Sequence, residues 1–378
     1  MVNNLKSNLG NLRWCSNCLA MSTRPRITFD ETGFCNACVW FKKKKEVNWN
    51  LRELELIKLL DSHRSKDGSF DCVVPCSGGK DGSYVAYSLK HKYGMNPLCV
   101  TITPALPLTL GETNLRNFVK SGYDHLSINP GFETMRKLNK LGFLEMGFPY
   151  YGWLISIITA PIKIALSNNI DLIFYGEDGE VEYGGSTESA ENPIYDTNYQ
   201  KRVYLEGGYE KVIEKSGITL DQLNYFAYPS DELLKNHDLK ITHWSYFENW
   251  DPYRNYLVAK QHCGLQESDS TNSGTFTNFA QNDQALYPLH AYLMYLKFGF
   301  GRANQDACIE VRRGAMNRDQ AINLVNLYDG QYPEEFIEMY LSYYQMTKPE
   351  FDQCLDKYAN RNLFEKINDR WLPKFKII

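Results

Sequence analysis

The stretch Pro75-Cys76-Ser77-Gly78-Gly79-Lys80-Asp81-Gly82-Ser83 joins two segments of different periodicity. Residues 70–74 before it are mostly apolar and predict a short buried strand, whereas residues 84–93 carry apolar side chains at helical spacing. The stretch is therefore a turn from a strand to a helix. Adjacent glycines let the backbone approach a ligand closely, and the free N–H groups at a helix N-terminus attract anions. A phosphate fits best, because Ser77, Ser83 and Lys80 add further donors.

Length and charge restrict the class of protein. The 378 residues are enough for two or three domains, and the formal net charge of −4 argues against a dedicated nucleic-acid binder. The longest apolar run, 153–166, is interrupted by Pro161 and Lys163 and is shorter than the roughly 18 residues that a membrane span needs. We expect no membrane segment. The N-terminus shows no secretory signal, so a cytoplasmic location is expected.

Two cysteine pairs mark a small N-terminal module, residues 1–48. Cys15 and Cys18 form one pair, and Cys35 and Cys38 form the other. This spacing predicts a zinc ribbon in which all four thiolates bind one Zn²⁺, with a β-hairpin between the pairs. Four protein ligands leave no open position, so the zinc is expected to be structural; two redox dithiols are the alternative. The following lysine run, 42–45, predicts a solvated face, with the docking of an acidic partner or the attraction of anionic substrate as the alternatives.

Strands and helices alternate after the turn. Strands are expected at 97–103, 125–128 and 170–175, and helices at 113–121, 133–141 and 151–167. This alternation predicts an α/β fold with a parallel sheet and helices on both faces. Ligands of such sheets bind at the carboxyl ends of the strands.

An acidic segment follows the last of these strands. Gly176, Glu177 and Asp178 would reach the same edge of the sheet as the glycines at 78 and 79. Carboxylates beside a polyphosphate indicate Mg²⁺, so Glu177 and Asp178 are its candidate ligands; an acidic surface turn is the alternative.

The rest of the chain suggests three further regions. We expect an α/β domain at 49–185 that carries the phosphate-binding stretch, an irregular insertion for the substrate at 186–282, and a helical region at 283–378 that completes the site. Glycines beside Lys297 and Arg302 suggest a basic loop that contacts phosphates or substrate.

The central stretch resembles the SGGxDS signature of the PP-loop ATP pyrophosphatases, which cleave ATP between its α and β phosphates. Gly82 is an extra residue relative to the shortest form of that signature, and the spacing differs from the P-loop. The resemblance implies an adenine nucleotide alpha hydrolase-like fold. It also implies an ATP site made by Ser77, Gly78, Gly79, Lys80, Asp81, Gly82, Ser83 and Gly176.

The whole chain resembles the N-acetyl sugar amidotransferases of bacterial surface-polysaccharide biosynthesis, of the LPS O-antigen or pseudaminic-acid (nonulosonic-acid) type. The resemblance rests on the two cysteine pairs, the central stretch, the segments 174–180 and 182–185, and the segment 297–302. It implies conversion of an acetamido group of a nucleotide-activated sugar to an acetamidino group, with ATP giving AMP and pyrophosphate. It also implies ammonia from a separate glutaminase and its synthase-like partner.

We assign expected roles on this basis. Lys80, Asp81 and Glu177 would act in catalysis, and Tyr183, Lys297 and Arg302 would contact the substrate. ATP, Mg²⁺ and Zn²⁺ are the expected cofactors. Two alternatives remain: a PP-loop tRNA thiolase, and a zinc-containing binding module without catalysis. The sequence has no Gly-x-Cys-x-Gly elbow typical of a nucleophile, so glutamine alone is not expected to serve as nitrogen source.

Overall fold

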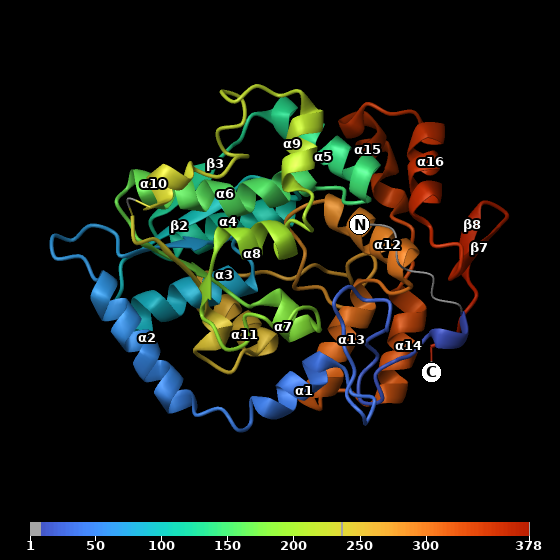
Figure 1. Cartoon of the computed structure of the whole chain (residues 1–378), viewed down its shortest axis with the longest axis horizontal. Coiled ribbons are helices and arrows are strands. Elements are labelled where there is room, and N and C mark those ends of the chain that lie inside the picture. The colour runs from blue at the N-terminus through green and yellow to red at the C-terminus, as the bar shows by residue number, and fades with distance from the viewer. Residues whose placement is uncertain (1–8, 236, 378) are drawn as a thin grey trace.

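The computed structural model describes residues 9–235 and 237–377, and its centre is a six-stranded sheet (Figure 1). The strand order is β3-β2-β1-β4-β6-β5, in which β5 alone is antiparallel to its neighbour. The strands are β1 (Cys72–Pro75), β2 (Pro97–Ile102), β3 (His125–Ile128), β4 (Leu172–Tyr175), β5 (Ile194–Tyr195) and β6 (Lys240–His243). The predicted α/β fold with a mostly parallel sheet is confirmed. The expectation of no secretory signal concerns residues outside the described ranges.

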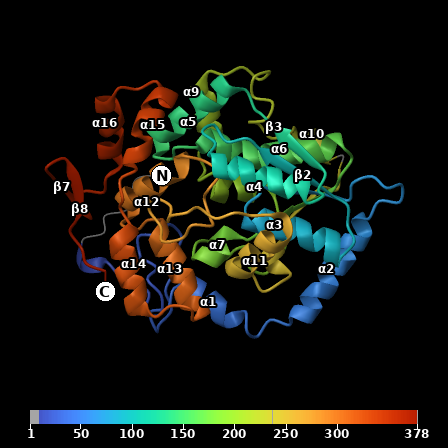
Figure 2. The same ribbon diagram turned by 180° about the vertical axis from the view of Figure 1, so that it is seen from behind.

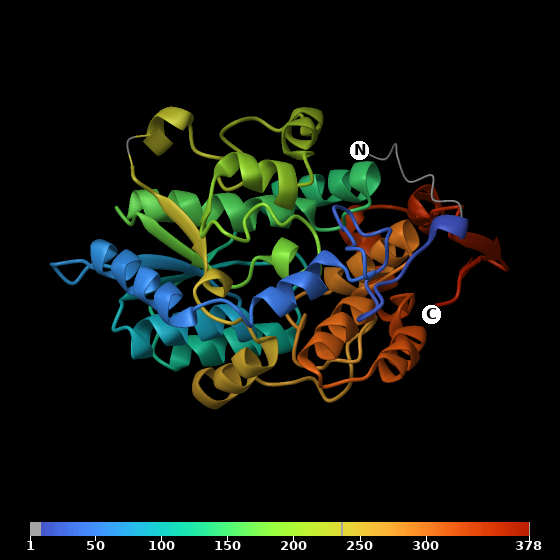
Figure 3. The ribbon, with the colours of Figure 1, turned by 60° about the horizontal axis from the view of Figure 1, so that its bottom comes forward.

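Helices cover both faces of the sheet because alternate strand residues point to opposite faces. Val73 of β1 belongs to a large core that includes residues of α5 and α6, whereas Cys72 and Val74 belong to a second core with α2, α3, α4 and α11. These helices are α2 (Trp49–His63), α3 (Lys80–Tyr87), α4 (Thr109–Lys120), α5 (Phe132–Met146), α6 (Tyr151–Ser167) and α11 (Pro252–Cys263). Figure 3 shows α6 and α3 on opposite sides of the strands. A parallel sheet buried on both faces is the arrangement expected from the sequence.

The helix after β1 begins earlier than predicted. Gly79 is its N-cap, with an extended backbone (φ −76, ψ 174), so α3 begins at Lys80 rather than at residue 84. A π-helical turn, Ser88–Lys92, follows α3. The first helical turn therefore contains Lys80 and Asp81, and the connection from β1 is short.

The region 186–282, expected to be irregular, contributes two strands to the central sheet. β6 pairs with β4 in parallel, and the edge strand β5 pairs with β6. The region also contains the short helices α8 (Thr197–Tyr199), α9 (Tyr209–Ser216) and α10 (Asp231–Lys235). The predicted division of the chain into domains stays a prediction.

The N-terminal module packs on the C-terminal region, as Figures 1 and 2 show from opposite sides. Its cysteines share a core with Ala307 and Cys308 of α13 and with Ala321 and Val325 of α14. The elements here are α1 (Asn36–Lys43), α12 (Leu286–Phe298), α13 (Arg302–Arg313), α14 (Arg318–Tyr328), α15 (Ile337–Tyr344), α16 (Lys348–Tyr358), β7 (Phe364–Ile367) and β8 (Arg370–Pro373). In place of the predicted hairpin, the structure has single antiparallel bridges, Trp14 with Met21 and Phe29 with Cys35.

No helix in the described parts of the chain combines the length and the apolar character that crossing a bilayer requires.

Candidate active site

The glycine loop, residues 76–79, leads from the carboxyl end of β1 to the first turn of α3. Its two glycines have different surroundings. Gly78 has φ +77, and a Cβ atom there would lie 2.5 Å from the backbone nitrogen of Leu115 in α4. A Cβ atom on Gly79 would meet only Ser77 Oγ, at 3.4 Å. The packing of the loop on α4 therefore requires Gly78, whereas Gly79 leaves open space before the helix N-terminus.

A cavity of about 240 Å³ opens at this point, where β1 and β4 end. It brings together residues that the sequence analysis selected from distant segments. Those that line it are Ser77, Gly79, Lys80, Asp81, Gly82, Glu177, Tyr183 and Arg302. The loop and α3 supply the first five, the segment after β4 supplies the next two, and the start of α13 supplies the last.

Two of the carboxylates that line the cavity, Asp81 and Glu177, interact with each other. Asp81 forms an ion pair with Lys80, and its Oδ1 accepts a hydrogen bond from Asn255 Nδ2 at 3.2 Å. Tyr183 donates its hydroxyl to Glu177 Oε1 at 3.2 Å. Burial, together with the negative charge of Asp81, raises the pKa of Glu177 to about 7. A divalent cation would relieve this repulsion, so Asp81 and Glu177 are suited to hold Mg²⁺.

Arg302, the first residue of α13, adds a positive charge to the cavity. Its Nη2 contacts Asp306 Oδ1 at 2.9 Å, one turn further along the helix. Its Nε is buried and has no hydrogen-bond partner among the described residues. A guanidinium with an unused donor is suited to a phosphate or carboxylate group of a ligand.

Asp178, a predicted ligand of Mg²⁺, does not line the cavity. It caps the short helix α7 (Gly179–Tyr183), and its Oδ1 accepts hydrogen bonds from the Glu180 nitrogen at 3.0 Å and from the Tyr204 hydroxyl at 2.9 Å. Its Oδ2 accepts a hydrogen bond from Ser189. Both oxygens are used inside the protein, so this geometry assigns Asp178 a structural role.

Four other predicted residues also lie away from the cavity wall, and one of them is Gly78, which packs on α4. Lys297 donates its Nζ to the carbonyl oxygen of Met146 at 2.8 Å, and burial lowers its pKa. The Ser83 hydroxyl is fully buried and has no partner among the described residues. Gly176 lies beside Trp250 and Asp81. Lys297 is therefore bonded within the protein in this structure, and its predicted contact with substrate stays a prediction.

The sequence analysis missed the wall formed by residues 279–287. Phe279, Asn282, Asp283 and Tyr287 line the cavity, and burial raises the pKa of Asp283 to about 6. Gly111 of α4 allows this segment to approach, because a Cβ atom there would lie 2.3 Å from the Asp283 Cα. This contact joins two segments that are far apart in the sequence, and no local motif predicts it. The one signal in the sequence is the glycine at position 111, which permits a close approach of another segment.

The four cysteines of the N-terminal module form a second candidate site. Their sulfur atoms all lie within 4.8 Å of one another, and all four side chains are buried. Backbone N–H groups point at two of the sulfurs: Cys35 N lies 3.2 Å from Cys15 Sγ, and Ala20 N lies 3.4 Å from Cys18 Sγ. Such donors offset the negative charge of thiolates. The cluster could therefore bind zinc, as the spacing predicted.

Comparison with known proteins adds information on the C-terminal part of the cavity. Residues 273–376, which include Asp283, Tyr287 and Arg302, match the family model described as "LPS biosynthesis protein WbpG-like, C-terminal domain". The chain is also similar to "Uncharacterized protein MJ1599" of Methanocaldococcus jannaschii, with 30% identity over 89 residues. That alignment covers 23% of this chain and 32% of the relative, so it spans about a third of the relative's length. The family match suggests that this chain has a role in LPS biosynthesis.

Proposed function

We propose that this chain is an ATP-dependent amidotransferase that converts an acetamido group of a nucleotide-activated sugar to an acetamidino group. The product would enter bacterial surface-polysaccharide or nonulosonic-acid biosynthesis. One observation supports the proposal most strongly. A single cavity joins the glycine loop and two carboxylates to residues of the C-terminal region that is similar to LPS biosynthesis proteins.

The glycine loop and α3 would hold the phosphates of ATP. The first turn of a helix has N–H groups without intrahelical partners, and Gly79 leaves the space before them open. Lys80 would add positive charge beside the pyrophosphate as it leaves. Asp81 and Glu177 would hold Mg²⁺, which supplies charge stabilisation of the phosphates when bound.

The reaction would begin with the amide oxygen of the sugar. This oxygen attacks the α-phosphorus of ATP, the bond to the β-phosphate breaks, and pyrophosphate leaves. Ammonia then attacks the carbon of the adenylylated group, the C–O bond breaks, and AMP departs with the former amide oxygen. Ammonia loses one proton to solvent as the C–O bond breaks, so the acetamidino product, with two protons on the new nitrogen and one on the former amide nitrogen, forms as an amidinium. Adenylation is needed because an amide oxygen is otherwise a poor leaving group.

The other groups of the cavity suggest how a sugar nucleotide is held. Arg302, with its unused Nε donor, would bind a phosphate of the substrate, and Tyr183 would lie between that phosphate and Glu177. Phe279 and Tyr287 offer aromatic faces against which a sugar or base can pack.

Ammonia would come from a separate glutaminase and its synthase-like partner. All ten cysteines are buried, so none is presented as an accessible nucleophile toward glutamine. Transfer from a docked partner would also protect the adenylylated intermediate from water.

The direct test is to incubate the purified chain with ATP, Mg²⁺, ammonium at alkaline pH and a panel of nucleotide-activated N-acetyl sugars. We expect AMP and pyrophosphate in equal amounts, together with a sugar product one mass unit lighter. Glu177→Gln serves as the matched variant that should lack activity. Formation of ADP, or AMP without any change in the mass of the sugar, would contradict the proposal.

The same assay separates the alternatives that the sequence left open. A PP-loop tRNA thiolase would bind tRNA in a gel shift and form AMP only when tRNA is added. A binding module without catalysis would form no AMP with either substrate. The cavity with Lys80, Asp81 and Glu177 favours an enzyme over this last alternative.

A further inference from the structure

Helix α7 separates two groups of residues within one acidic segment. Glu177, which precedes the helix, and Tyr183, its last residue, line the cavity. Glu180 and Glu182, within the helix, instead contact the N-terminal module that carries the four cysteines. The segment 177–185 therefore has two faces, and the proposed catalysis uses only one of them.

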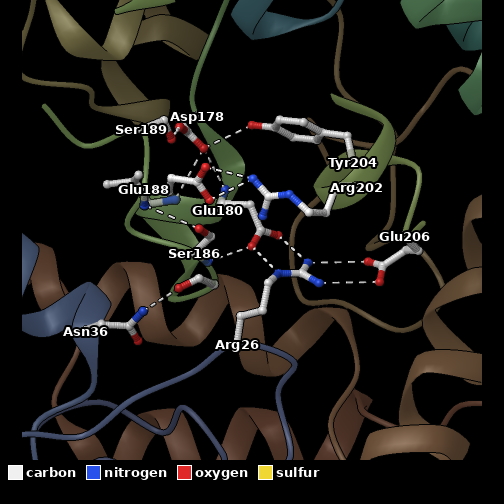
Figure 4. Close-up of polar contacts among 12 residues, drawn as sticks. Arg26, Asn36, Asp178, Glu180, Ser186, Glu188, Ser189, Arg202, Tyr204 and Glu206 are labelled. Atoms are coloured by element: carbon white, nitrogen blue, oxygen red, sulfur yellow. Dashed lines mark hydrogen bonds and ion pairs between the residues drawn. The ribbon is translucent and has the colours of Figure 1, made fainter. Parts of the chain in front are cut away.

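The contacts of the second face are specific and close. Arg26 binds Glu180 through two hydrogen bonds, from Nε at 2.7 Å and from Nη2 at 2.8 Å, and it reaches Glu206 as well (Figure 4). Asn36 Nδ2 donates to the carbonyl oxygen of Gly185 at 2.5 Å (Figure 4). A bidentate pair between guanidinium and carboxylate fixes orientation as well as distance.

Glu182 is held still more tightly. Lys44 Nζ lies 2.8 Å from Glu182 Oε2, and Trp40 Nε1 donates to Glu182 Oε1 at 3.0 Å. The Lys44 side chain is only 4% exposed and that of Glu182 only 14%, so water screens this pair weakly. The lysine run 42–45 was predicted to be a solvated face. That prediction is wrong for Lys44, which is buried because it pairs with Glu182.

One arginine connects the cysteine cluster directly to the same helix. Arg312 of α13 points its Nη1 at Cys18 Sγ, at 3.7 Å, and donates from Nη2 to the carbonyl oxygen of Glu182 at 3.0 Å. The next residue is Tyr183, whose hydroxyl donates to Glu177. A continuous series of contacts thus runs from a cysteine of the cluster to a carboxylate of the cavity.

A helix as short as α7 cannot hold its position alone. It spans Gly179–Tyr183, whereas isolated helices shorter than about 12–15 residues are marginal in water. Its place depends on the Asp178 cap on one side and on the N-terminal module on the other. Weakening the second set of contacts should therefore let Glu177 and Tyr183 move.

We infer that the N-terminal cysteine module is a positioning element for the cavity: through Arg26, Trp40 and Lys44 it fixes α7 and thereby orients Glu177 and Tyr183. Arg26, Glu180, Lys44 and Glu182 are positioning residues, because none of them lines the cavity. The effect on catalysis rests on the proposed function, but the effect on the mobility of α7 does not.

The test compares Arg26→Met with Arg202→Met. Both variants lose one guanidinium, but Arg202 pairs with Glu188 at 2.7 Å in an exposed position, where both side chains are more than half exposed. In Arg26→Met, we expect amide hydrogen exchange over residues 177–185 to accelerate about tenfold or more. The kcat for AMP formation should fall about 10- to 100-fold, since small misplacements of catalytic groups have effects of this size. ATP binding without Mg²⁺, which depends on the glycine loop, should change less than about twofold.

Two further variants make the result decisive. Glu182→Gln keeps the shape of the side chain and removes its charge, and it should reproduce the effect of Arg26→Met; Arg26→Lys keeps the charge and should restore part of the lost kcat. Unchanged exchange over 177–185 in both Arg26→Met and Glu182→Gln would overturn the inference, as would an equal effect of Arg202→Met. If the wild-type chain formed no AMP, the proposed function would fail, and the exchange comparison would still decide the role of the module.

Discussion

Replacing Gly79 by alanine tests whether a phosphate binds in the space before α3. The new Cβ atom would meet only Ser77 Oγ at 3.4 Å, an ordinary van der Waals contact. Alanine adopts the observed backbone conformation (φ −76, ψ 174) without strain. It is a poorer N-cap than glycine by about 0.5–1 kcal/mol, but it restricts the unfolded chain by a similar amount, about 0.4–1 kcal/mol. We therefore expect the free energy of unfolding to change by less than about 1 kcal/mol.

Binding of ATP should respond much more strongly than stability. Gly79 lines the cavity, so the added methyl group would occupy the position where a pyrophosphate approaches the backbone. Hydrogen bonds to such a charged group contribute roughly 1.5–3 kcal/mol each. Loss of one of them raises the Kd of ATP about 10- to 150-fold.

Gly78→Ala is the matched control, with the opposite expectation for stability. A residue other than glycine at φ +77 costs about 1–2 kcal/mol, and a Cβ atom 2.5 Å from the Leu115 nitrogen forces the loop away from α4 at a further cost of about 1–3 kcal/mol. Urea unfolding measures the stability of both variants, and calorimetry measures their ATP binding. Wild-type affinity in Gly79→Ala would refute the reasoning, as would a larger loss of stability in Gly79→Ala than in Gly78→Ala.

Three further predictions follow from the site. Glu177 binds its proton more tightly in the folded chain, where its pKa is about 7, than in the unfolded chain, so it destabilises the fold increasingly as pH rises from about 4 to 8. The gain in stability of Glu177→Gln over wild type, measured by urea unfolding, should therefore be larger at pH 8 than at pH 5; an equal gain at both would contradict the assigned burial. Cys38→Ser should lose bound zinc in elemental analysis and lower the free energy of unfolding by about 4 kcal/mol or more, whereas a wild-type protein without zinc would argue against the metal site. The purified chain should form product with ammonium but not with glutamine until a separate glutaminase is added, and product from glutamine with this chain alone would refute the need for a partner.

Periodicity predicted the bounds of an element best where its local sequence signal is clear. The bounds of α6 and β3 are those predicted, because a long apolar helix and a strand between two turns have clear local signals. β5 and β6 were not predicted. β5 spans only Ile194–Tyr195, and β6 mixes Lys240 with buried Ile241. β6 is a strand because β4 provides an edge to pair with, and β5 is a strand because β6 then provides the next edge.

Motifs predicted part of the site, and tertiary packing decided the rest. The glycine loop, Glu177, Tyr183 and Arg302 meet in one cavity as their positions at strand and helix ends suggested. Side chains of neighbouring residues can point in different directions, and their order in the sequence does not predict which. The Asp178 side chain caps α7 inside the protein, whereas the Glu177 side chain lines the cavity. Asp283 lines the cavity through a close approach to Gly111, which no local pattern encodes.

The fate of the amide oxygen tests the proposed chemistry most directly. A nucleotide-activated N-acetyl sugar labelled with ¹⁸O in its acetamido carbonyl is incubated with the chain, ATP, Mg²⁺ and ammonium, and the products are separated by mass spectrometry. If the amide oxygen is adenylylated before ammonia attacks, the label appears in the phosphate of AMP, and the sugar product carries none. Label found in pyrophosphate or inorganic phosphate, or unlabelled AMP beside an amidine product, would contradict adenylation of the amide oxygen.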